Sequence, residues 1–158
     1  MIVNKHSYSS IRLKNVAYKL FLDITTEDYK VIFDQFLALC KDVGVSSAGP
    51  INFAVTQVDL QKRFNIEVFM TVDRAFRPTK DLNFRTYFCI DMLLHGRITS
   101  NNFVDDEIVL LEEMNRFAKE NKLTFASPYY HTFKTDRKSE KGWICLLYTS
   151  SETTRTGR

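Results

Sequence analysis

The chain has 158 residues, of which 44% are hydrophobic and 26% are charged, which is typical of one globular domain and excludes a wholly disordered chain. The net charge of +3, with acids and bases interspersed, does not favour direct binding of nucleic acid. No stretch approaches the ~20 apolar residues of a membrane helix, and the N-terminus lacks the apolar core of a signal peptide. We therefore expect a cytoplasmic protein without membrane contact.

Alternation of apolar and polar residues predicts a first strand over Ile11–Ile24. Lys19 and Asp23 fall on its polar face. The predicted apolar face carries Val16, Tyr18, Leu20, Leu22 and Ile24.

A helix is predicted to follow this strand. Thr25 and Asp28 form a capping-box pattern, in which a hydroxyl and a carboxylate satisfy backbone amides at a helix start. Gly44 supplies the left-handed residue that ends such a helix. Between these signals, apolar residues recur every three or four positions, at Tyr29, Ile32, Phe33, Phe36, Leu37 and Cys40.

Two strands joined by a polar turn are predicted next, over Ile51–Val58 and Phe64–Val72, after the break at Gly49-Pro50. Arg77–Asp81 is the most linker-like interior segment.

The second half repeats the pattern. A strand is predicted over Phe84–Leu94, ending near His95-Gly96, and a helix over about Asn102–Asn121. The apolar stripe of this helix is predicted to hold Val104, Ile108, Leu111, Met114, Phe117 and Ala118. Strands over Tyr129–Lys134 and Trp143–Tyr148, joined by a charged turn at 135–141, close the domain, and residues 151–158 are expected to form a flexible tail.

The two halves align without a gap at an offset of 78 residues, which places Asp28 on Asp106 and Pro50 on Pro128. Strand, helix, turn and strand fall in the same register in both halves. We therefore predict an α+β fold within a single domain over residues 1–150. It would contain two pseudo-symmetric βαββ repeats, at about 10–73 and 83–149, whose helices cover an antiparallel sheet with a central cleft.

Cys40, Cys89 and Cys145 are odd in number and lie among apolar residues, so we expect reduced thiols in the core. The three histidines show no metal-ligand spacing, and the five glycines form no phosphate-binding loop. We expect neither a metal nor a cofactor.

The duplicated βαββ pattern resembles the GyrI-like family, which is related to effector-binding domains of bacterial transcription regulators. The resemblance spans nearly the whole chain. Its carriers are Ala48-Gly49-Pro50, Ala126-Ser127-Pro128, the His95-Gly96 step and the closing strand pair.

The resemblance implies a cleft between the halves that binds small lipophilic molecules, often cations held by a Glu. At that position this sequence has His131, followed by Phe133 where the family has Tyr. A histidine with an ordinary pKa near ~6.5 is mostly neutral in the cytosol, so this departure weakens the preference for cations that the resemblance implies.

Aromatic and polar residues on the predicted strands are the candidate ligand-binding groups. Alternation places Tyr129, His131 and Phe133 on one side of their strand. Glu67 is either a solvated residue or a pocket acid, since the resemblance allows an acid on the inner face of that strand. The full predicted set is Tyr18, Phe53, Glu67, Tyr87, Tyr129, His131, Phe133, Trp143 and Tyr148.

We predict a stand-alone module that binds a small lipophilic or aromatic molecule. Both predicted helices cover sheets, which leaves no helix-turn-helix for DNA. One alternative is a protein-interaction module, such as an inhibitor, immunity or secretion-helper protein with a filled cleft. A hydrolase using Trp143 and Glu67 is the third possibility, and no catalytic residue is assigned.

Overall fold

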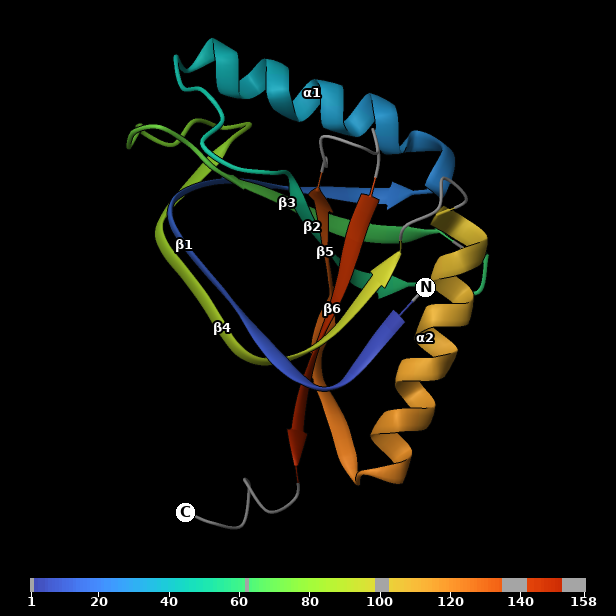
Figure 1. Ribbon diagram of the computed structural model, residues 1–158. Helices are drawn as coiled ribbons and strands as arrows, with labels where there is room; N and C mark the ends of the chain where they lie inside the picture. The colour runs from blue at the N-terminus through green and yellow to red at the C-terminus, as the bar shows by residue number, and fades with distance from the viewer. Residues whose placement is uncertain (1, 62, 99–102, 135–141, 152–158) are drawn as a thin grey trace. The chain divides into compact units, whose positions relative to one another are not determined.

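The computed structural model describes the chain outside residues 1, 62, 99–102, 135–141 and 152–158 (Figure 1). Within helices and strands, side chains are described except at 2–9, 57–58, 91–98, 103–107, 123–129, 133–134 and 142–151. The predicted turn at 135–141 and most of the predicted tail lie outside the described residues.

The described chain has an α+β fold with antiparallel strands and two helices, as predicted. Each half has the order strand, helix, strand, strand. The elements are β1 (Ile2–Ile24), a 3-10 turn (Thr26–Asp28), α1 (Tyr29–Asp42), β2 (Asn52–Val58), β3 (Phe64–Thr71), β4 (Asn83–Ile98), α2 (Phe103–Glu120), β5 (Leu123–Lys134) and β6 (Gly142–Ser151).

The chain divides into two compact units. One unit is Arg12–Cys89, and the other combines Met1–Ile11 with Ile90–Arg158. Both long strands are therefore shared, because β1 is divided after Ile11 and β4 after Cys89. These limits differ from those of the predicted repeats, which follow one another along the sequence.

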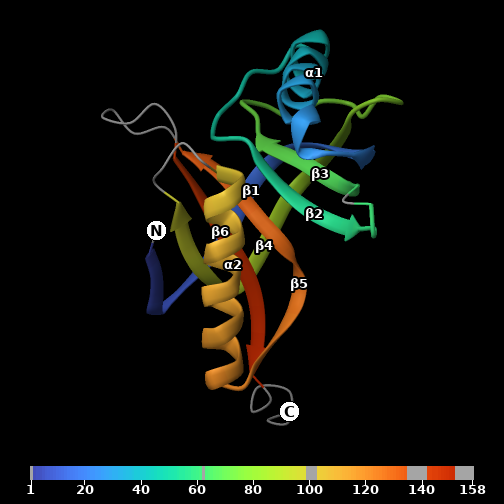
Figure 2. The ribbon, with the colours of Figure 1, turned by 90° about the vertical axis from the view of Figure 1, so that its right-hand side faces the viewer.

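In the Arg12–Cys89 unit, β3 pairs with β1 on one side and β2 on the other, and α1 lies across one face of this sheet (Figures 1 and 2). Phe53 of β2 contacts two aromatic rings of α1, with ring-centre distances of 5.3 Å to Tyr29 and 5.7 Å to Phe33. Residues opposite each other in antiparallel strands share a face. The buried residues of the helix-covered face are Ala17, Phe21, Phe53, Ile66, Val68 and Met70.

Both predicted ends of α1 are confirmed. The Asp28 carboxylate accepts a hydrogen bond from the backbone N–H of Thr25 at 2.9 Å, which is the carboxylate half of a capping box. At the other end, Gly44 has a φ of 82°, its N–H donates to the Lys41 carbonyl, and the Val45 N–H donates to the Cys40 carbonyl. These two bonds form a Schellman motif, which satisfies carbonyls at the end of the helix.

The predicted apolar face of β1 is wrong at Leu20 and Leu22. Leu20 and Leu22 are 47% and 63% exposed, whereas Phe21, between them, is 8% exposed. The helix covers the face that carries Phe21. Alternation defines the two faces of a strand but does not show which of them is buried. Asp23 has a φ of 58°, and the pairing with β3 shifts between Phe21 and Ile24, so this bulge returns Ile24 to the core.

In the other unit, β6 pairs with both β4 and β5, and α2 lies alongside β5 (Figure 2). Three strand limits differ from the prediction. Gly96 lies inside β4, paired with Cys145, so the His95-Gly96 step is part of a strand and does not introduce the helix. Pro128 lies inside β5, where the pairing with β6 shifts between Phe125 and Tyr129, so this proline marks a bulge. β6 continues to Ser151, which pairs with Leu123.

The buried stripe of α2 confirms the prediction at Met114, Phe117 and Ala118 and differs from it at Ile108 and Leu110. Leu110 and Met114 are fully buried, and Phe117 and Ala118 are nearly so. Ile108, which was predicted to be buried, is 55% exposed. Leu110, Met114, Phe117 and Ala118 are spaced by four, three and one residues, which places all four on one face of the helix.

Only one of the two cysteines with described side chains is a core thiol. Cys40 on α1 is 2% exposed, as predicted. Cys89 is exposed, which corrects the expectation that every cysteine is buried. It lies at the point where β4 leaves the Arg12–Cys89 unit.

We expect the free energy of unfolding to fall as the pH rises from about 9 to about 11. Burial raises the pKa of the Cys40 thiol from 9.0 to about 11. The folded protein therefore holds this proton more tightly than the unfolded chain, and the resulting stabilisation, of the order of 2 kcal/mol, is present below pH 9 and lost through pH 11. Urea denaturation at several pH values should show a smaller fall for Cys40→Ala. Equal slopes for the two proteins would contradict this assignment.

Candidate functional site

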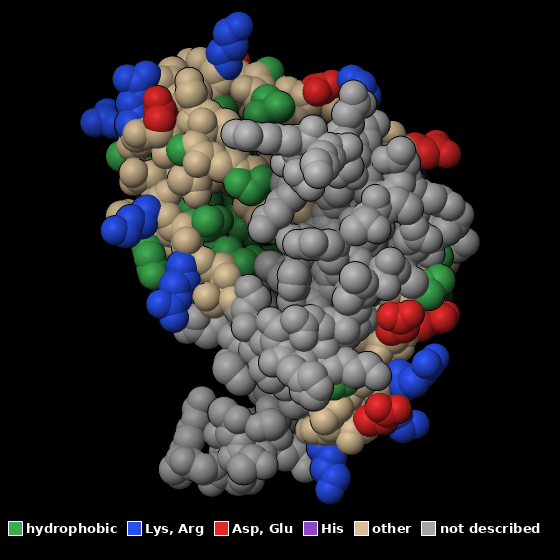
Figure 3. Space-filling view, in the orientation of Figure 1, with side chains coloured by type: hydrophobic (Ala, Val, Ile, Leu, Met, Phe, Trp, Pro, Cys, Tyr) green, Lys and Arg blue, Asp and Glu red, His purple; other side chains and the backbone are tan. Residues whose placement is uncertain are grey.

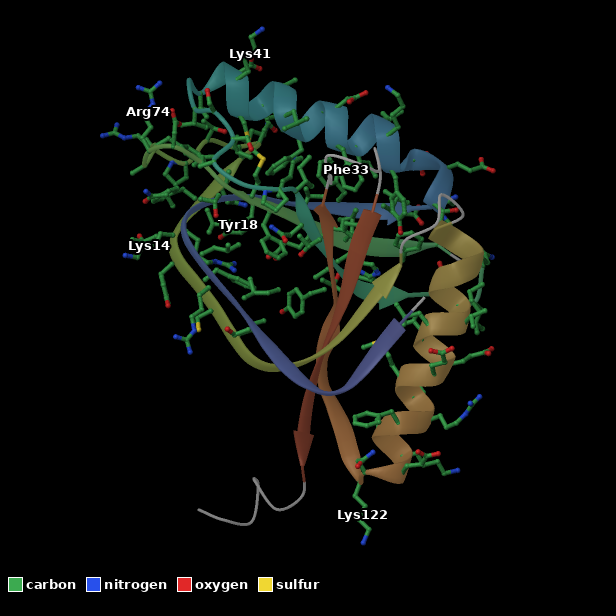
Figure 4. All side chains as sticks on the ribbon, viewed as in Figure 1. Lys14, Tyr18, Phe33, Lys41, Arg74 and Lys122 are labelled. Carbon is green, nitrogen blue, oxygen red and sulfur yellow. The ribbon has the colours of Figure 1, made fainter. Side chains whose placement is uncertain are left out.

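The candidate site lies on the face of the β1–β3–β2 sheet that points away from α1, which we call the distal face. It is defined by the strand register: Tyr18 and Asn52 stand opposite Phe69, and Leu20 and Ala54 stand opposite Glu67. Figure 4 shows Phe33 between α1 and the sheet and Tyr18 on the other side of β1. Because side chains alternate along β3, Glu67 and Phe69 share the distal face, while Ile66 and Val68 face α1.

An arginine from β4 lies over this face. The guanidinium carbon of Arg85 is 4.2 Å from the centre of the Tyr18 ring and 5.5 Å from the centre of the Phe88 ring. Both distances are within the range of cation–π attraction. Arg85 belongs to the same compact unit as Tyr18, so these contacts lie within one unit.

The same guanidinium faces a carboxylate. Arg85 Nη1 is 3.8 Å from Glu67 Oε1, which is an ion pair but is longer than a hydrogen bond. The Glu67 side chain is 27% exposed and that of Arg85 is 36% exposed. Both groups are therefore partly withdrawn from water, which makes their mutual attraction stronger than that of a fully solvated pair.

Aromatic rings surround this pair. Phe69, which is 1% exposed, lies 4.9 Å from Phe88 between ring centres.

The distal face also carries a buried amide. Asn52, 4% exposed, donates through its side-chain amide to the Pro50 carbonyl at 3.2 Å. In Figure 3, hydrophobic side chains reach the surface beneath α1, with Lys and Arg side chains along the neighbouring edge.

The distal face also carries the hydroxyl group of Thr71, for which the described residues supply no hydrogen-bond partner. The hydroxyl oxygen of Thr71, two residues beyond Phe69 on β3, is buried and has no hydrogen-bond partner among the described residues. An unsatisfied buried hydroxyl is unfavourable, so a ligand group that accepts or donates there would gain affinity.

The structure brings Tyr18 and Glu67 together, because both contact Arg85. It separates Phe53 from them: this residue is fully buried beneath α1, on the opposite face of the sheet, and belongs to the core. Phe53 pairs with Val68 and therefore shares the face that α1 covers. The strand pattern alone does not show which face the helix covers, so it could not distinguish Phe53 from a ligand-binding aromatic residue. Tyr87 is 50% exposed and neighbours Phe88 on β4.

The remaining predicted residues belong to the other unit. His131 is 1% exposed and pairs with Cys145, and its neighbours Tyr130 and Thr132 are each 8% exposed, so both faces of β5 are covered there. The His131 side chain is therefore buried. The side chains of Tyr129, Phe133, Trp143 and Tyr148 lie outside the described ones, although their backbones are in β5 and β6.

Sequence reasoning missed Arg85, Phe69 and Phe88. Phe69 lies between the apolar residues Val68 and Met70, so the sequence around it does not distinguish it from a core residue. Arg85 lies between Phe84 and Thr86, where a cation on a strand is ordinarily solvated. The available signal was that Arg85 and Glu67 are opposite charges on strands otherwise rich in aromatic residues.

The described residues hold no group of three or more His, Cys, Asp or Glu side chains placed to bind a metal ion. Neither α1 nor α2, as far as they are described, has the length and apolar character to cross a membrane.

Comparison with known proteins places the sequence in one family. Residues 12–147 match the family described as Domain of unknown function (DUF5085). Among curated proteins, none matches the sequence.

Solved structures with the same fold share little sequence with this chain. The C-terminal domain of EcmrR is 8% identical, with a TM-score of 0.64, and the match covers 91% of this chain and 98% of that domain. EcmrR in its complex with DNA is 11% identical, with a TM-score of 0.66, and the match covers 92% of this chain and 57% of that one. A hydrolase from Listeria innocua is 10% identical, with a TM-score of 0.56 and coverage of 91% and 92%. These likenesses support the predicted GyrI-like resemblance at the level of fold alone.

Proposed function

We propose that this chain, which belongs to the DUF5085 family, binds a small lipophilic or aromatic molecule on the distal face of its β1–β3–β2 sheet. The single observation that carries the proposal is the partly buried Glu67–Arg85 pair set among the rings of Tyr18, Phe69 and Phe88. Small-molecule sites are mostly apolar and aromatic, with a few polar groups that fix the ligand's orientation.

The composition of this face is unusual for a purely structural role. A core face would hold apolar residues alone, as the helix-covered face does at Ile66, Val68 and Met70. A solvated face would leave its charges fully exposed, whereas Glu67 and Arg85 are only about one quarter to one third exposed. Aromatic rings around a partly desolvated charge pair offer stacking surfaces and polar contacts in one place.

The proposal predicts that Tyr18→Ala weakens binding of an aromatic probe about tenfold. The substitution removes the ring over which Arg85 lies, and an aromatic contact with its buried area contributes about 1–2 kcal/mol. The measurement is a titration of 1-anilinonaphthalene-8-sulfonate followed by its fluorescence, with circular dichroism to verify that both proteins are folded.

Val31→Ala is the control for the loss of an exposed apolar side chain. Val31 lies on α1, which covers the opposite face of the sheet, and is 67% exposed, so its removal should leave probe affinity unchanged. Equal affinities for the wild type and Tyr18→Ala would place the probe elsewhere and remove the basis for the proposed site.

One observation favours a protein-interaction role as the second candidate. Leu20 and Leu22 continue the distal face along β1 and are 47% and 63% exposed, and exposed apolar residues on one strand are a common feature of protein contacts. In that case Leu22→Ala, and not Tyr18→Ala, would have the larger effect on association with the partner. The hydrolase alternative, which uses Trp143 and Glu67, stays a prediction, because the Trp143 side chain lies outside the described ones.

A further inference from the structure

We infer that Arg85 determines the charge selectivity of the distal face, because its guanidinium occupies a cation site formed by Tyr18, Phe88 and Glu67. The inference rests on the proposed function and specifies the class of ligand: neutral or anionic aromatic molecules are accepted, and cationic ones are disfavoured.

The groups around the Arg85 guanidinium are those that would bind an aromatic or lipophilic cation. The Tyr18 ring centre is 4.2 Å away, the Phe88 ring centre is 5.5 Å away, and Glu67 Oε1 lies 3.8 Å from Nη1. Ring faces and a carboxylate both attract positive charge. In this chain the cation is covalently attached to β4 and is present at high effective concentration, so a free cation must displace it.

The guanidinium also removes the attraction for a second cation that approaches without displacing it. Its own charge balances that of Glu67, so the pair presents no net negative charge to a ligand. The planar guanidinium, stacked on Tyr18, can instead face an aromatic ring or pair with an anionic group of the ligand. The distal face is therefore suited to neutral or anionic aromatic ligands, whereas its carboxylate alone would select cations.

A single substitution should change the net charge that the Glu67–Arg85 pair presents to a ligand. At 3.8 Å it is longer than a hydrogen bond, and both side chains retain contact with water. Replacing Arg85 with glutamine keeps much of the side chain's length and polarity but removes the charge, which leaves Glu67 without its counter-charge. Replacing Glu67 with glutamine leaves the charge of Arg85 uncompensated.

The test uses tetraphenylphosphonium and tetraphenylborate, two ions of nearly equal size and shape with opposite charge. Their dissociation constants are measured by calorimetry for the wild type, Arg85→Gln, Glu67→Gln and the double variant. We expect the wild type to bind the borate at least as tightly as the phosphonium. Arg85→Gln should bind the phosphonium about tenfold tighter than the wild type does and the borate more weakly. Glu67→Gln should shift the preference toward the borate, and the double variant should largely lose the difference.

Arg77→Gln is the control for the loss of one positive charge, since Arg77 is an exposed arginine of the same unit and should leave the preference unchanged. An unchanged ratio of the two affinities in Arg85→Gln would overturn the inference. If Tyr18→Ala still weakened both probes, the proposed binding site would stand without it. Absence of binding of either probe to every variant would overturn both.

Discussion

Replacing Phe53 with alanine should lower the free energy of unfolding by about 3–5 kcal/mol, the usual cost of removing a fully buried phenyl ring. Phe53 is 0% exposed and contacts Tyr29 and Phe33 of α1. The variant would lose the ring's transfer free energy and leave a cavity between helix and sheet. Urea denaturation followed by far-ultraviolet circular dichroism would measure the change.

Tyr87→Ala provides the comparison for Phe53→Ala. Both residues were predicted to bind the ligand, but Tyr87 is 50% exposed on β4, and its truncation should change stability by less than about 1 kcal/mol. A Phe53→Ala protein as stable as the wild type, with weakened probe binding, would show that Phe53 is a ligand residue and that its placement in the core is wrong.

Replacing Leu110 with alanine should destabilise the protein by about 2–5 kcal/mol. Leu110 is fully buried on α2, one helical turn before Met114, which is also fully buried. The result tests the one buried position that the sequence pattern missed, because in this part of the helix the pattern had placed Ile108 and Leu111 in the stripe and left Leu110 out. Denaturation measured as for Phe53→Ala would detect the loss.

The adjacent residue supplies a control of nearly the same chemistry. Val109 is 43% exposed, so Val109→Ala removes an apolar side chain from the same helix with an expected cost below about 1 kcal/mol. Ile108→Ala, at 55% exposure, should behave similarly. A larger loss for Ile108→Ala than for Leu110→Ala would restore the original stripe.

Most elements of the fold could be predicted because their signals are local. The Thr25–Asp28 cap and Gly44 mark the ends of α1 through hydrogen bonds made within a few residues. The faces of β1 could not be assigned in the same way. Leu20 and Phe21 are both apolar, and only the position of α1, set by contacts distant in sequence, determines that Phe21 is the buried one.

The candidate site was predictable in part for the same reason. Tyr18 and Glu67 were identified as single residues of suitable chemistry, and the register of β1 on β3 brings them onto one face. Arg85 comes from a strand further along the chain, and its contacts with both residues are tertiary. Periodicity says which way a side chain points along its own strand, but not which side chain of another strand it meets.

Because β1 is divided between the units after Ile11 and β4 after Cys89, cleavage between the two sequence halves cannot give two intact compact units. A single cut in the segment between the two sequence halves, at Arg77–Asp81, would separate Met1–Ile11 from the residues 90–158 with which they form a unit. It would also remove Arg85 from the fragment that holds Tyr18 and Glu67. Fragments made at that boundary would each lack part of a compact unit, so binding assays require the uncut polypeptide.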